Sequence, residues 1–143
     1  MVYNFFPENG LALLFAGIRN GIAVVERLTN GKSEKLIDFP DTDGSLWSPQ
    51  LTPEAGFAFQ RSKDGTYRLW VQTLSGETLY KGEWTPDPRT HTEGEALQLA
   101  VDFQGGDQNA FYAFIHDLNG SGISLFRYDL TDGSLKEKLI WEE

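Results

Sequence analysis

The residues whose types and spacing come closest to a metal site lie in the stretch DLNGSG, residues 117–122. Asp117, Asn119 and Ser121 alternate ahead of Gly122, as oxygen ligands do at the start of an EF-hand calcium loop. The match ends at the glycine, because the later ligand positions hold apolar or aromatic residues in place of acidic ones. The stretch therefore predicts either a weak calcium site or an Asx-type hairpin turn, and no other cofactor is expected.

Residue combinations typical of enzymes do not stand out. Two histidines, His91 and His116, are too few for an all-histidine three-ligand zinc site, and the chain has no cysteine. His116 and Asp117 are adjacent, so in a strand their side chains point to opposite faces and make a poor dyad. We expect a protein that is not an enzyme. The alternative is a hydrolase that uses an unrecognised carboxylate pair among the 21 acidic side chains.

The candidates for binding are one long polar insertion and three tryptophans. The insertion TPDPRTHTEGE, residues 85–95, is stiffened by two prolines and is either a functional loop or a tolerated surface insertion. The tryptophans of the middle of the chain either form an aromatic platform beside this loop or pack in the core. The candidate binding residues are Trp47, Trp70, Trp84, Arg89 and His91.

Charge narrows the range of partners. With 12 basic and 21 acidic side chains the net charge is −9, which would repel nucleic acid and an anionic membrane surface. The apolar run of residues 11–16 is far shorter than a membrane span and no basic residues precede it. The sequence therefore predicts neither a signal peptide nor a transmembrane segment, and it indicates a cytoplasmic protein with a protein or peptide partner.

The elements that must position these residues are strands. Almost every apolar run has four to eight residues and ends at Gly, Asn-Gly, Asp-Gly or Pro, which is typical of β structure. Three units of four runs each are visible, about residues 1–40, 41–85 and 95–143. The chain, 1–143, is predicted to be a single all-β domain built from three four-stranded antiparallel units, an arrangement similar to propeller blades.

The units resemble one another most at their last hairpin. Its turn reads LTNG at residues 28–31, LSG at 74–76 and LTDG at 130–133. Each unit then closes its fourth strand on an aromatic residue, and these residues are Phe39, Trp84 and Trp141.

The second unit carries a resemblance to a known family. Its segments LWSP at residues 46–49, TPEAGFAF at 52–59, KDG at 63–65 and LWV at 69–71 resemble the blade repeat of propellers such as the periplasmic Tol-system protein. The other two units match this pattern weakly. The resemblance implies a scaffold that binds proteins or peptides, and it transfers no catalytic residue.

Three blades leave two open ends, because closed propellers typically have about four to eight. We therefore expect a half-propeller that pairs with a second copy as a homodimer, or with a partner, and that recognises a protein or peptide. The alternative fold is an up-and-down β-barrel, which would hold a small ligand or carbohydrate. Runs that are apolar on both faces, such as LALLFA and FAF, favour the propeller-like arrangement.

Overall fold

The computed structural model describes residues 2–8, 12–39, 47–61, 67–84, 99–107, 110–117 and 122–143. They form twelve strands, and no helix occurs in these ranges. The strands are β1 (Val2–Pro7), β2 (Ala12–Arg19), β3 (Ile22–Thr29), β4 (Lys32–Phe39), β5 (Trp47–Leu51), β6 (Ala55–Arg61), β7 (Tyr67–Thr73), β8 (Thr78–Trp84), β9 (Leu99–Asp107), β10 (Ala110–Asp117), β11 (Ile123–Thr131) and β12 (Ser134–Glu142).

The strands pair as three separate antiparallel sheets of four. The first sheet is β1-β2-β3-β4, the second β5-β6-β7-β8 and the third β9-β10-β11-β12, each in chain order. The prediction of an all-β chain is confirmed, and each sheet falls within one of the predicted units. The β-barrel alternative is wrong, because the three sheets are not joined edge to edge into one closed sheet.

Three hairpin turns have the backbone that their sequences predict. Asn20-Gly21, Asn30-Gly31 and Asp132-Gly133 all have positive φ at both residues, between 49° and 79°. This is the pattern of a type I′ turn, whose twist matches that of antiparallel strands and which favours Asn-Gly and Asp-Gly. The turn sequences thus set where β2, β3, β4, β11 and β12 begin or end.

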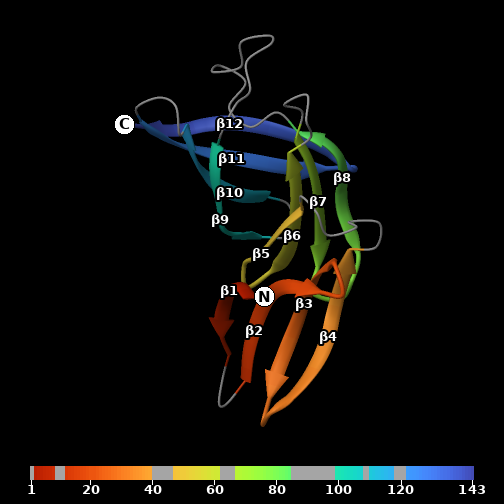
Figure 1. Ribbon diagram of the computed structural model, residues 1–143. Coiled ribbons are helices and arrows are strands. Elements are labelled where there is room, and N and C mark those ends of the chain that lie inside the picture. The colour runs from red at the N-terminus through yellow and green to blue at the C-terminus, as the bar shows by residue number, and fades with distance from the viewer. Residues whose placement is uncertain are drawn as a thin grey trace.

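The sheets follow one another along the molecule, with the second sheet between the other two (Figure 1). The first strands of the three sheets, β1, β5 and β9, lie toward a common side, and the last strands, β4, β8 and β12, lie on the outside (Figure 1).

Two apolar clusters hold the sheets together. One lies between the first and second sheets and includes Val25, Phe39 and Trp70. The other lies between the second and third sheets and includes Phe57 and Phe103, whose rings stack at 4.4 Å. The second sheet is thus buried on both faces. Its run FAF alternates between them, with Ala58 toward the first sheet and Phe57 toward the third.

Two glutamines of the second sheet add polar links to this packing. The Gln50 side chain donates from Nε2 to the Val101 carbonyl (2.8 Å), and its Oε1 accepts from the Phe103 amide (3.0 Å). Gln72, on the opposite side, donates to the Asp38 carbonyl of β4 (3.2 Å). Gln50 therefore ties β5 to β9, and Gln72 ties β7 to β4.

Candidate binding surface

Trp70 and Trp84 both lie in the interior. Trp70 is 6% exposed between the first and second sheets, where it packs edge-on against Phe39 at 5.3 Å. Its Nε1 donates to Thr78 Oγ1 (3.3 Å), and Lys81 Nζ lies 3.9 Å from its ring centroid. Trp84 is 3% exposed among aromatic rings of the second and third sheets. The structure thus gives both indoles the core position that was one of the two alternatives for them.

The other candidates lie wholly or partly outside the described residues. Trp47 begins β5, opposite Gln60, but its side chain is not among those described. Arg89 and His91 belong to residues 85–98, which are outside the described ranges. They stay predictions.

The same holds for the calcium loop. Asp117 ends β10, and its side chain, together with Asn119 and Ser121, is outside the described set. In the described part of the chain, no group of three or more His, Asp or Glu side chains is placed to hold a metal ion. Calcium binding by residues 117–122 remains a prediction.

The surface with the strongest binding features is the face of the third sheet that points away from the second sheet, here called the outer face of the third sheet. Strand β11 defines it by alternation. Phe126, Tyr128 and Leu130 point into the core between the sheets. Leu125, Arg127 and Asp129 alternate with them and are partly exposed, so they lie on the outer face.

An apolar row crosses this face. Phe114 of β10, Leu125 of β11 and Trp141 of β12 are direct partners in the strand register. Phe114 and Leu125 are half-buried, whereas Trp141 is 50% exposed and its neighbour Ile140 is 45% exposed. Ile140 and Trp141 are the large hydrophobic residues that stand out as exposed in the described part of the chain. Exposed apolar side chains gathered on one face mark a surface for interaction.

A polar group flanks the apolar row. Arg127 donates from Nη1 to the Tyr112 hydroxyl and from Nε to Asp129 Oδ1, both at 2.9 Å. The hydrogen bond to Asp129 and then that to Tyr112 raise the pKa of Arg127 above its usual value, which keeps the guanidinium charged. Lys136 and Lys138 are the register partners of Asp129 and Arg127 and share this face. Three basic side chains thus gather around Asp129 on this face, in a chain whose net charge is −9.

The first sheet has a corresponding outer face, which points away from the second sheet. Phe15 and Glu26 are opposite each other in the register and both lie on it. The Arg19 guanidinium pairs with the buried Glu26 carboxylate through Nε at 2.7 Å and lies 5.8 Å from the Phe15 ring centroid. Phe15 and Glu26 are both buried, so the exposed part of this pair of contacts is the Arg19 side chain.

Chemically, the two outer faces offer packing area, aromatic rings and fixed charges. The sequence pattern of β11, ISLFRYDLT, contained the alternation that separates the two faces of the third sheet. The exposed position of Trp141 was not apparent, because a β-bulge in β12 changes which way its side chain points.

No family model matches this chain, and no curated protein matches its sequence. The resemblance of the second unit to Tol-type blades stays a prediction. Among the described residues there is no helix with the length and apolar character needed to cross a membrane.

Proposed function

We propose that this chain is a non-enzymatic binding module that recognises a protein or peptide, and that the outer face of the third sheet is its contact surface. The observation that carries the proposal is the row Phe114, Leu125 and Trp141, which ends in an indole that is half exposed. Aromatic residues beside arginine are the commonest anchors of protein interfaces. Tyr112 and Arg127 supply that second feature next to the row.

We further propose that the three sheets are half of a β-propeller. Four-stranded antiparallel sheets in chain order, with their first strands toward a common side, are what blades look like in sequence and in space (Figure 1). The link from Gln50 to the β9 backbone, next to the common side, supports this arrangement. In the half-propeller that we propose, the outer face of the third sheet is the surface on which the next blade would pack.

The proposal can be tested by selecting ligands from a random peptide display library with the full-length chain as the target. Selected peptides are then titrated against the wild type and against Trp141→Ser by fluorescence polarisation. We expect Trp141→Ser to weaken binding by about 30-fold or more, since loss of an aromatic anchor typically costs about 2 kcal/mol or more. Lys32→Ser, in the turn end of the first sheet, is the matched control and should leave affinity unchanged.

Peptides that bind the wild type and Trp141→Ser with equal affinity would show that the outer face of the third sheet is not the contact surface. The non-enzymatic part of the proposal is tested separately with a panel of hydrolase substrates. Turnover that is lost on substitution of a carboxylate would contradict it.

A further inference from the structure

The aromatic residues that close the fourth strands have a common role in the two contacts between sheets. Phe39, at the end of β4, is buried and packs edge-on against Trp70 of the second sheet. Trp84, at the end of β8, is buried against Phe103 and Tyr128 of the third sheet, with centroids at 5.7 and 5.8 Å. In both contacts the closing aromatic of one sheet packs against an aromatic of the following sheet.

Trp141 occupies the corresponding place in the third sheet. It lies near the end of β12, on the face opposite the second sheet, where a following sheet would pack. Among the described strands no further sheet packs there, and the indole is half exposed. Among the described residues no other sheet packs on the outer face of the first sheet, where the exposed Arg19 lies over the buried Phe15 ring.

Resting on the function proposed above, we infer that the occupant of the outer face of the third sheet is the outer face of the first sheet of a second copy of this chain. Trp141 then packs on the exposed Arg19 side chain, which lies over the buried Phe15 ring, and continues the contact that Phe39 and Trp84 make within the chain. Two copies joined in this way at both ends form one ring of six sheets, within the range of about four to eight blades at which propellers close.

Charge favours this head-to-tail contact over a contact between two third sheets. Arg127, Lys136 and Lys138 form a basic cluster around Asp129 on the outer face of the third sheet, and two such clusters facing each other repel, although Asp102 and Glu143 occupy positions near the edges of the same face. On the outer face of the first sheet the described charges balance. Arg19 pairs with Glu26, and Lys35 pairs with Asp38 at 3.0 Å.

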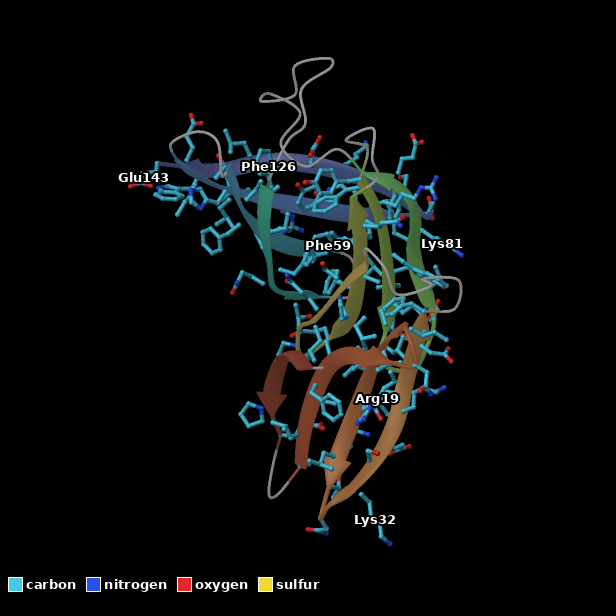
Figure 2. All side chains as sticks on the ribbon, in the orientation of Figure 1. Arg19, Lys32, Phe59, Lys81, Phe126 and Glu143 are labelled. Atoms are coloured by element: carbon cyan, nitrogen blue, oxygen red, sulfur yellow. The ribbon has the colours of Figure 1, made fainter. Side chains whose placement is uncertain are left out.

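The ring also accounts for the open edges of the molecule. In Figure 2 the labelled Lys32 lies at the tip of the first sheet and Glu143 at the end of the third, at opposite extremes of the molecule. In the described part of the chain the two outer faces therefore lie apart, and in the inferred dimer a second copy covers both.

The first experiment is light scattering of the purified full-length chain across a dilution series. We expect a species of twice the 16.1 kDa chain mass, and Trp141→Arg should weaken the dimer by about 30-fold or more, the loss typical of a buried aromatic anchor. Glu137→Arg is the matched control, since it adds the same side chain on β12 at a register position opposite Tyr128, away from the outer face. Circular dichroism checks that both variants are folded.

The second experiment identifies the faces that meet. Because the chain has no cysteine, Lys138→Cys and Lys35→Cys place single thiols on the outer faces of the third and first sheets. A short bis-maleimide should cross-link a mixture of the two variants into a heterodimer, which the mixture of Lys138→Cys with Lys32→Cys should form poorly. Cross-linking of Lys138→Cys alone, at the yield of the mixture, would show that two third sheets meet and would overturn the inference.

A wild type that stays monomeric at every concentration would also overturn it. If peptide binding still depended on Trp141 in that case, the proposed function would stand and only the identity of the partner would be wrong. A dimer that is insensitive to Trp141→Arg would contradict both the inference and the contact surface.

Discussion

At the scale of single residues, the molecule uses its polar side chains to join sheets. Gln50 is the clearest case, because one side chain satisfies both a carbonyl and an amide of β9. A side-chain amide that pairs in this way takes the place of a neighbouring strand. It allows β5 and β9 to approach each other without forming a continuous sheet.

Substitution of Gln50 by leucine should lower the free energy of unfolding by about 1–3 kcal/mol. The apolar side chain keeps most of the volume but leaves the Val101 carbonyl and the Phe103 amide without this partner. Urea denaturation followed by tryptophan fluorescence measures the change. Gln60→Leu, on β6, is the matched control and should change stability by less, within about 0.5 kcal/mol. Equal losses for both variants would refute the role given to Gln50.

The raised pKa of Tyr80 predicts how the free energy of unfolding changes at alkaline pH. Burial and then the nearby Glu83 carboxylate raise the pKa of Tyr80 above the usual 10.0, and its hydroxyl donates to the Glu83 carbonyl. Because the neutral phenol is favoured in the folded state, its contribution is complete below pH 10 and is lost as pH rises through the folded pKa. The difference in phenolate absorbance between the wild type and Tyr80→Phe should show a midpoint above 10.0. A midpoint below that value would contradict the assignment.

At the scale of the element, turns and strands could be read from the sequence because they are local. The Asn-Gly and Asp-Gly turns require positive φ at both residues, and the strands on each side of them follow. The face of the sheet on which a residue lies could not always be predicted from the sequence. Leu139 and Trp141 are two residues apart and would share a face in a regular strand.

A β-bulge in β12 separates them. Leu139 is opposite Phe126 and packs toward the core, whereas Trp141 is opposite Leu125 on the outer face, so Ile140 is the extra residue. No local pattern indicates this bulge. The interior positions of Trp70 and Trp84 were also open in the sequence, because they depend on contacts between sheets that are far apart along the chain.

The contact between the first and second sheets predicts a sharp effect at Gly56. A Cβ atom there would lie 2.8 Å from Ile37 Cδ1 and 2.9 Å from Val25 Cγ2, both within the core between these sheets. Gly56→Ala should therefore lower the free energy of unfolding by about 1–3 kcal/mol through overpacking.

Gly105→Ala is the control for that variant, since the nearest atom to its Cβ would be a Glu54 carboxylate oxygen at an ordinary 3.5 Å. Chemical denaturation of both variants should show a loss for Gly56→Ala alone. If Gly56→Ala were as stable as the wild type, the first and second sheets would have to lie further apart than these distances indicate.

At the scale of the whole molecule, the first and second sheets and the second and third sheets pack through contacts of the same kind. Each internal contact buries both partners, as the burial of Phe39 and Trp84 shows, while Trp141 is left half exposed. A repeat of this kind is stabilised mainly by its neighbours, so in the dimer inferred above the first and third sheets would gain most from the second copy. If that dimer forms, the thermal midpoint of the wild type should rise with protein concentration, because association stabilises the folded state by mass action.

A covalent tandem of two copies gives the last prediction. If the third sheet of one copy packs on the first sheet of the next, joining the first copy's Glu143 to the second copy's Met1 should let the ring close within a single chain. The linker should be flexible and at least as long as residues 85–98, which connect β8 to β9.

Because linking makes the contact intramolecular, the tandem should stay a monomer of about twice 16.1 kDa with a thermal midpoint independent of concentration. Trp141→Arg in both halves should lower that midpoint by more than Glu137→Arg in both halves, which lies away from the outer face. A tandem that assembles further by light scattering would show that the two ends of one chain do not fit each other.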